Sequence, residues 1–282
     1  MGSCRDDLVA LAHRLDMLGP LPRVAALHLP PPAADGTRDG EFCAVELEDG
    51  SRGLSFVLLG DTLARLRAGD AAALAGMPAL ELAQRYAHAD AAQRAIGFAA
   101  LNALTHHLFD RAGYVPPPAQ GSIGDLDLAP GDRIGMVGLF PPLVKQVLAS
   151  GASLTVIELR ADLAGDHDGW RVTLDPAALA GCNKVLSTST VLLNDTLDGL
   201  LGHCRGAQRV SVIGPGAGCL PDPLFARGVT LLGGSWIVDA PAFKAALAAG
   251  RSWSAHAVKS AIRRDHYPGF ETLLERAAAT RR

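Results

Sequence analysis

The chain has 282 residues, of which 49% are hydrophobic, and a formal net charge of -3 at pH 7. This length and composition allow one large domain or two ordinary ones with a sizeable core. Lysine and arginine are scattered along the chain, so the basic face that nucleic-acid binding requires is not expected. Apolar runs stay short of the roughly 18 residues that span a bilayer, and residues 1–7 are polar. We therefore expect a cytoplasmic protein without a membrane partner.

The cysteines indicate reduced thiols rather than a disulfide framework. There are five of them without CxxC spacing, so pairing would leave one over. His203 and Cys204 are adjacent, and Cys182 and Cys219 lie on either side of them in the sequence, which leaves a metal site open. Apolar flanks are more typical of small core residues, and we predict no bound metal.

The first 120 residues predict a small α+β domain. Apolar side chains recur at three- and four-residue spacing over residues 6–18, which predicts a helix. Short apolar runs follow at residues 24–29, 42–47 and 54–59, and Asp49-Gly50 favours a tight hairpin turn between the last two. Residues 61–109 are rich in helix formers. We expect an antiparallel sheet covered by helices.

A proline-rich segment at residues 114–121 is predicted to be a linker or a crossing strap, because each proline lacks a backbone donor. Beyond it, apolar runs of β type alternate with helical stretches, as in βαβ units around a parallel sheet. The predicted strands are residues 133–140, 154–160, 171–174, 184–188, 209–213 and 229–232, and the predicted helices are residues 142–150, 175–180, 193–203, 223–226, 241–249 and the tail from residue 270. The predicted fold class is α/β, with a Rossmann-like domain over residues 121–282 preceded by the α+β domain over residues 1–120.

The first predicted strand-to-helix turn of this second domain reads Gly135-Met-Val-Gly-Leu-Phe-Pro-Pro142. In an open parallel sheet, ligands bind outside the carboxyl ends of the strands, where helix N-termini and loop amides converge. Gly138 would let a ligand approach the backbone closely, although a glycine needed only for the turn is the alternative. The motif is not GxGxxG, so a dinucleotide is not expected. We assign Gly135, Gly138 and Phe140 to the ligand site.

Two acidic residues follow the next predicted strands. Glu158 comes after an apolar run, roughly twenty residues beyond the glycine turn, where a carboxylate accepts hydrogen bonds from the hydroxyls of an adenosine ribose. A solvated strand end is the alternative. Asp175 ends the following strand, where it either receives an adenine amino group or caps the helix that Pro176 opens.

A hydroxyl-rich segment, Ser187-Thr-Ser-Thr-Val-Leu-Leu-Asn-Asp-Thr196, leads from a strand into a helix. Capping uses one or two of these polar groups and leaves several for a ligand. We assign Ser187 to ligand binding, and Ser189, Thr190 and Asn194 to orienting the reacting end of a substrate. Glycine-rich loops at residues 213–218 and 233–235 offer backbone amides to an anion, and we add Gly214 to the predicted site.

At these motifs the sequence resembles the family called "Putative heavy-metal chelation" domain proteins. The resemblance covers most of the chain and rests on the glycine turn at residues 135–142, Glu158, residues 187–196, 213–215 and 233–239, and Ala95-Ile-Gly-Phe-Ala-Ala-Leu-Asn-Ala-Leu104. It implies an enolase-N-terminal-like domain joined to a Rossmann-like one. The same arrangement also resembles S-adenosylmethionine-binding Rossmann domains, and among them the azetidine-2-carboxylate synthases.

The second resemblance implies an enzyme that takes S-adenosylmethionine as substrate or cosubstrate. Its methionyl amine would attack the carbon beside sulfur, close a four-membered ring and release methylthioadenosine; methyl or aminocarboxypropyl transfer are broader variants. Holding the reacting groups in line supplies up to roughly 7–11 kcal/mol in the best intramolecular cases. An aromatic face would stabilise the sulfonium, and the candidates are Phe140 first, then Tyr86, Phe98, Trp170 and Trp236.

Two other functions stay open. One is a heavy-metal chelation or metallophore-handling protein without S-adenosylmethionine chemistry. The other is a non-catalytic sensor or assembly module that uses the same pocket. In each case we expect a small-molecule ligand as the partner, and a homodimer is left open.

Overall fold

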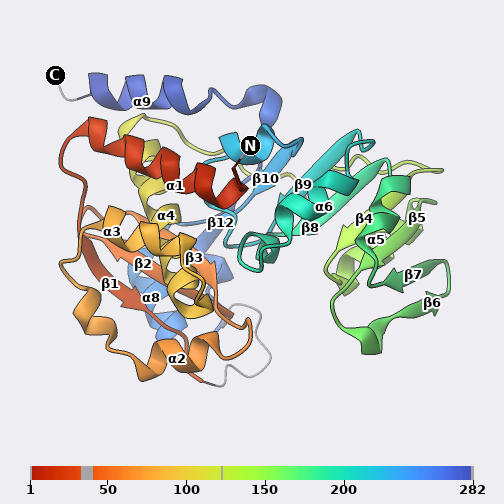
Figure 1. Ribbon diagram of the computed structural model, residues 1–282, viewed down its shortest axis with the longest axis horizontal. Coiled ribbons are helices and arrows are strands. Elements are labelled where there is room, and N and C mark those ends of the chain that lie inside the picture. The colour runs from red at the N-terminus through yellow and green to blue at the C-terminus, as the bar shows by residue number, and fades with distance from the viewer. Residues whose placement is uncertain (1, 33–40, 122, 281–282) are drawn as a thin grey trace.

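The computed structural model of the protein describes residues 2–32, 41–121 and 123–280 (Figure 1). It has a mixed α/β architecture, with an antiparallel three-stranded sheet early in the chain and a large, mostly parallel eight-stranded sheet later. The predicted fold class is confirmed. In Figure 1 the red to yellow elements of the first hundred residues form one half of the molecule, and the green to cyan strands form the other.

The small sheet consists of β1 (Val24–His28), β2 (Phe42–Leu47) and β3 (Arg52–Phe56), in that order. The predicted hairpin joins β2 to β3, and Gly50 adopts a φ of +89° in its turn. All six residues of β2 are buried, because the sheet is covered on both of its faces. The alternating pattern expected of a half-exposed strand is therefore missing from β2.

Helices pack around this sheet, and the longest of them, α4 (Ala91–Arg111), is buried along most of its length and contacts both β2 and β3. Its apolar residues occupy every face, as expected for a helix inside a core. The other helices here are α1 (Cys4–Arg14), η1 (Leu15–Leu18), α2 (Thr62–Ala68), η3 (Ala71–Leu74), α3 (Ala79–Gln84) and η4 (Arg85–Ala87), where η marks a 3-10 helix. Within the described ranges, every helix is too short or too polar to cross a bilayer.

The large sheet has the order β13-β10-β9-β8-β4-β5-β7-β6, in which the six central strands run parallel and the two outermost strands run antiparallel to their neighbours. If the six parallel strands are numbered along the chain, with β4 as the first, β5 as the second and β7 as the third, their order across the sheet is 3-2-1-4-5-6. This is the strand order of dinucleotide-binding Rossmann folds. The strands are β4 (Arg133–Val137), β5 (Ser153–Ile157), β6 (Gly165–His167), β7 (Trp170–Thr173), β8 (Lys184–Thr188), β9 (Arg209–Ile213), β10 (Leu231–Gly233) and β13 (Ile262–Arg263).

The connections between these strands are short helices. They are α5 (Pro141–Ala149), η5 (Ala161–Leu163), η6 (Pro176–Gly181), η7 (Ser189–Leu192), α6 (Leu197–His203) and α7 (Asp222–Phe225). The helix predicted over residues 175–180 is of the 3-10 type. The helix predicted over residues 193–203 begins only at Leu197, because Asp195 has a φ of +61° and interrupts the helical path.

After β10 the chain returns to the first half of the molecule, except for β13, which belongs to the large sheet. The two-stranded sheet of β11 (Ser235–Ile237) and β12 (Ala257–Lys259) frames α8 (Ala240–Ala248), and Phe243 of α8 packs with Trp253 and with Phe42 of β2 in one apolar cluster. Helix α9 (Phe270–Ala279) lies beside α4; the remaining 3-10 helices are η8 (Ser254–His256) and η9 (Arg264–His266). The proline-rich segment pairs with this region, since Ala119 N donates to Lys259 O. A division of the chain at residue 120 stays a prediction.

Candidate functional site

A cavity of about 1260 Å³ lies at the carboxyl ends of the parallel strands. Its lining comes from residues after β4, β5, β8 and β9, and from residues that begin β2 or end and follow β3. Strand β5 lies on one side of β4 and β8 on the other, so the strand order reverses between β4 and β8. Residues that follow these two strands line the cavity. This is the place where open α/β sheets bind their ligands.

The glycine turn after β4 forms part of the cavity wall. Gly138 has a φ of +83°, and a Cβ atom there would lie 3.2 Å from Cγ2 of Thr188, so a side chain at this position would meet both strain and contact. Phe140 precedes α5, whose first residue is Pro141, and it lines the cavity with Gly138. Gly135 does not line the cavity. A Cβ atom on it would lie 2.6 Å from the Leu179 side chain, so it allows η6 to pack on β4.

Glu158 follows β5, and its carboxylate reaches across to the glycine turn. Its Oε1 accepts a hydrogen bond from Leu139 N at 2.6 Å, and its Oε2 accepts one from Leu159 N at 3.2 Å. The side chain is half-buried and lines the cavity. Because each carboxylate oxygen has a second lone pair, both remain able to accept from a ligand. The backbone thus fixes this carboxylate beside the position predicted for a ribose.

Asp175 lies outside the cavity lining, although its neighbours Leu174 and Pro176 belong to it. Its side chain is exposed, and Oδ1 accepts a hydrogen bond from Ala177 N at 2.9 Å. Of the two roles that the sequence left open, the structure shows the helix cap.

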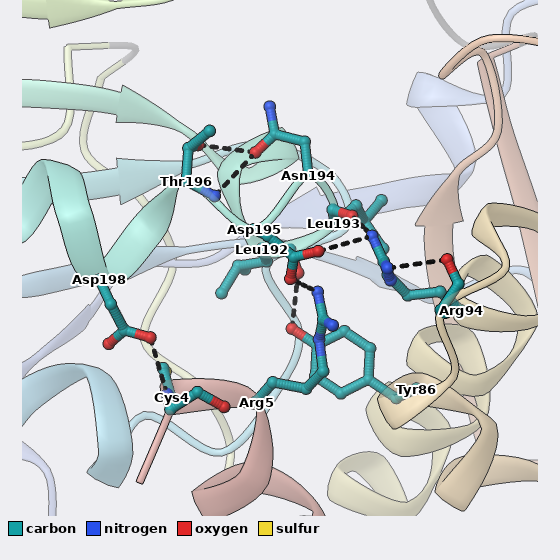
Figure 2. A network of polar contacts seen from close by, with 12 residues as sticks. Cys4, Arg5, Tyr86, Arg94, Leu192, Leu193, Asn194, Asp195, Thr196 and Asp198 are labelled. Atoms are coloured by element: carbon teal, nitrogen blue, oxygen red, sulfur yellow. Dashed lines mark hydrogen bonds and ion pairs between the residues drawn. The ribbon is translucent and has the colours of Figure 1, made fainter. Parts of the chain in front are cut away.

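The hydroxyl-rich segment divides its side chains between the core and the cavity. Ser187 is buried in β8 and does not line the cavity, whereas Ser189, Thr190 and Asn194 do. Asn194 Oδ1 accepts a hydrogen bond from Thr196 Oγ1 at 2.6 Å (Figure 2). This bond uses the amide oxygen and not the amide NH2 group, which can donate to a ligand. The structure therefore brings together seven of the ten predicted site residues, namely Gly138, Phe140, Glu158, Ser189, Thr190, Asn194 and Gly214.

Asp195, which the sequence did not single out, shapes this segment. Its backbone is left-handed, with a φ of +61°, a conformation that Asp adopts more readily than most residues with a side chain. Figure 2 shows its carboxylate between Arg5 of α1 and Arg94 of α4, with which it forms ion pairs. The first half of the molecule therefore holds the loop that carries Asn194.

The cavity lining also includes residues of the first, antiparallel sheet, which no sequence pattern indicated. It includes Phe42 and Phe56, whose rings meet edge to face with centroids 5.6 Å apart, and the exposed Leu58. These residues lie about 80 or more positions before the glycine turn, and a residue pattern carries no local signal of such an approach. Lys259 of β12 adds a positive charge to the lining.

A metal bound directly by protein side chains does not fit the described part of the chain. All five cysteines are buried, and burial raises the pKa of Cys4 and Cys43 to about 12 and that of Cys204 to about 11. Burial thus disfavours the thiolate form, which is the form that binds metals. Residues 2–32, 41–121 and 123–280 contain no group of three His, Cys, Asp or Glu side chains able to hold a metal ion.

Fold and cavity together define an α/β protein with a small antiparallel sheet and a pocket at the switch point of its large, mostly parallel sheet. A sequence model of the DUF364 family, described as "Putative heavy-metal chelation", matches residues 123–264, and one of DUF4213, described in the same words, matches residues 40–105. The first match alone spans half of the chain, so the chain belongs to the DUF364 family. The resemblance to the heavy-metal chelation family that the sequence indicated is confirmed. The resemblance to azetidine-2-carboxylate synthases stays a prediction.

Two solved structures share the fold. A protein of unknown function from the DUF364 family of Desulfitobacterium hafniense is 19% identical with a TM-score of 0.69, over 93% of this chain and 98% of that one. A second, from Pyrococcus horikoshii, is 19% identical with a TM-score of 0.65, over 91% and 99% of the two chains. An uncharacterized protein of Methanocaldococcus jannaschii is 29% identical over 154 residues, which are 53% of this chain and 57% of that protein. The match thus spans little more than half of this curated relative.

Proposed function

We propose that the cavity binds a small molecule with an adenosine part, and that this molecule is S-adenosylmethionine. Glu158 carries the proposal, because its carboxylate is fixed by Leu139 N at 2.6 Å beside the glycine turn, after the second strand of a Rossmann-ordered sheet. A carboxylate at this place accepts hydrogen bonds from ribose hydroxyls in nucleotide-binding folds. Gly138 is consistent with this placement, since it belongs to the turn that Glu158 contacts and lines the same cavity.

The polar end of the ligand would lie toward Ser189, Thr190 and Asn194, which line the same cavity. Hydroxyl groups accept from an amine and donate to a carboxylate, and the Asn194 amide donates to a carboxylate. Phe140 and Phe42 both line the cavity and would be the aromatic contacts of a sulfonium. This arrangement suits a ligand that is apolar and cationic in the middle and polar at both ends.

Within this proposal the reaction is cyclisation of S-adenosylmethionine. The amine nitrogen forms a bond to the side-chain carbon attached to sulfur, the bond between that carbon and sulfur breaks, and its electron pair leaves with neutral methylthioadenosine. The ammonium form of the amine loses its one proton to solvent before this attack, because only the neutral nitrogen has a lone pair to form the new bond, and azetidine-2-carboxylate remains with its ring nitrogen protonated. Methyl or aminocarboxypropyl transfer to a second molecule would use the same binding site.

Binding and turnover are tested separately. Calorimetry with S-adenosylmethionine should give a measurable Kd for the native protein and a weaker one for Glu158→Ala. Mass spectrometry after incubation should detect azetidine-2-carboxylate in amounts that exceed the protein concentration, and not in a protein-free control, because S-adenosylmethionine also degrades to methylthioadenosine by itself. Absence of binding would reject the proposal, and binding without product would reject the cyclisation alone.

A second candidate is a protein that handles a metal already held in an organic chelator. The family description favours a metal, and the described residues offer no group of side chains to bind one directly. A chelate would bring its own ligands and could occupy a cavity of this size. Metal analysis of protein purified without chelating agents decides between the candidates: stoichiometric metal accompanied by an organic molecule favours the chelate, and metal-free protein that binds S-adenosylmethionine favours the first proposal.

A further inference from the structure

The loop of residues 192–195 is held from behind by the first half of the molecule, on the side away from Asn194 (Figure 2). Tyr86 Oη donates to Leu192 O at 2.6 Å, and Arg94 Nη1 donates to Leu193 O at 2.8 Å. The carboxylate of Asp195 then pairs with Arg94 at 3.1 Å and with Arg5. Three of the four loop residues are thus bound by groups from η4, α4 and α1.

The two arginines are suited to fixing a loop because they are themselves fixed. Their side chains are only 16% (Arg5) and 11% (Arg94) exposed. Arg94 also donates to Ala89 O at 3.1 Å, and the Arg5 guanidinium lies 5.3 Å from the Tyr86 ring centroid. Asp195 joins these two cations, and without it their like charges would face each other across the loop.

Asn194 lies between the bound residues and turns toward the cavity. Its own amide oxygen is held by Thr196, so little freedom remains for the side chain once the backbone on either side is fixed. The left-handed φ of Asp195 sets the direction in which Asn194 leaves the loop. Anything that releases Asp195 therefore releases Asn194 as well.

We propose that Arg5 and Arg94 are positioning residues of the cavity, which act through Asp195 to hold the Asn194 amide against the ligand. The identity of the ligand rests on the function proposed above, whereas the holding of the loop does not. Because coupling between two events is reciprocal, a ligand that contacts Asn194 also strengthens the docking of α1 on the loop. Part of the ligand site is thus built by the amino-terminal helix.

Variants at residue 195 separate conformation from ion pairing. Gly accepts a left-handed backbone without strain but cannot pair with arginine. If only the conformation matters, Asp195→Gly binds S-adenosylmethionine like the native protein. If the arginines position the loop, Asp195→Gly and Arg5→Ala both bind about tenfold more weakly, as expected for one lost charge-assisted hydrogen bond. Arg5→Lys restores part of the affinity.

Arg14→Ala is the matched control. Arg14 belongs to the same helix as Arg5 and pairs with Glu271 of α9 at 2.5 Å, away from the loop. Hydrogen exchange of the amides of residues 192–196 is measured for Arg5→Ala and Arg14→Ala without ligand. Faster exchange in Arg5→Ala alone is the expected result, and equal exchange in both variants overturns the inference even if the native protein binds no S-adenosylmethionine. Faster exchange with an unchanged Kd overturns the link to the ligand.

Discussion

The Oγ atom of Ser189 lies where Gly214 would place a side chain: a Cβ atom on Gly214 would be 2.2 Å from it. Ser189 opens the 3-10 helix after β8, and Gly214 follows β9 with a φ of +152°. Two strand ends therefore meet without a gap beside the cavity, and they do so only because residue 214 has no side chain. The hydroxyl-rich segment and the glycine-rich loop, which the sequence suggested separately, form one packed unit.

Gly214→Ala should lower the free energy of unfolding by about 1–3 kcal/mol through overpacking, and backbone strain at its φ of +152° adds to the loss. Chemical denaturation measures it. Ser189→Ala in the same background should recover part of the loss, because it removes the closest atom. Gly199→Ala serves as the control: Gly199 also lines the cavity but has open space around it, so no loss is expected. Equal effects at both glycines would show that the contact with Ser189 is unimportant.

Elements with strong local signals were predicted well. The bounds of β2, β8 and β9 agree with the expected runs, because each is an apolar β-type segment with turn residues at its ends. The run predicted at residues 54–59 is shifted in the structure to Arg52–Phe56, since the Asp49-Gly50 turn fixes the register and pairs Arg52 with Glu46. Apolarity alone does not reveal register.

Features that depend on distant partners were not predictable. Strands β11 and β12 are three residues long and pair Ser235 with Lys259 across 24 positions, so neither contains a pattern of its own. The aromatic wall at Phe42 and Phe56 and the arginines that hold Asp195 come from the first hundred residues. The sequence identified the half of the cavity that belongs to the parallel sheet and missed the half that folds against it.

Asn102 of α4 connects the two halves through a buried amide. Its Nδ2 donates to Leu54 O at 2.7 Å and to Gly216 O at 2.9 Å, and the side chain is 2% exposed. Asn102→Ala should lower the free energy of unfolding by about 1–3 kcal/mol, because it leaves buried carbonyl groups without a donor. Asn102→Asp, which removes both donors and adds a charge, should be worse. Denaturation curves in which Asn102→Asp is as stable as the native protein would contradict this role.

Glu46 should make stability depend on acid pH. Burial tends to raise its pKa, but hydrogen bonds from His28, Arg52 and Lys244 overcome this effect and lower the pKa from 4.5 to about 2. Because the folded-state pKa is depressed, the carboxylate contributes its full stability above pH 4.5 and loses it as the pH falls through about 2. The stability difference between the native protein and Glu46→Gln should therefore shrink over this range. Glu275→Gln, at an exposed position of α9, controls for the loss of a charge. If the stability difference between the native protein and Glu46→Gln stays constant as the pH falls, the prediction is refuted.

Asp132 and Lys184 form an ion pair at the amino-terminal ends of the strands, opposite the cavity. Lys184 Nζ lies 2.7 Å from Asp132 Oδ2, and both side chains are at most 10% exposed. Asp132→Ala should lower the free energy of unfolding by about 3 kcal/mol, because it leaves a buried ammonium group without a counter-charge, with Asp127 O as its remaining acceptor. Lys184→Met in that background should recover stability. Calorimetry should show unchanged ligand affinity, and a weakened Kd would mean that this edge of the sheet communicates with the cavity.

Glu158 and Asp175 follow neighbouring strands, and their contacts predict opposite behaviour. Glu158→Ala should weaken binding of S-adenosylmethionine by about 2–3 kcal/mol through lost charge-assisted hydrogen bonds, while Glu158→Gln, which keeps an acceptor for Leu139 N, should lose less.

Asp175→Ala should instead cost about 1 kcal/mol of stability as a lost cap and leave the Kd unchanged, because its carboxylate faces Ala177 N outside the cavity lining. Calorimetry and denaturation of the three variants distinguish the roles. If Asp175→Ala weakens binding as much as Glu158→Ala, Asp175 contacts the ligand, and the cap that the structure shows gives way when the site is filled.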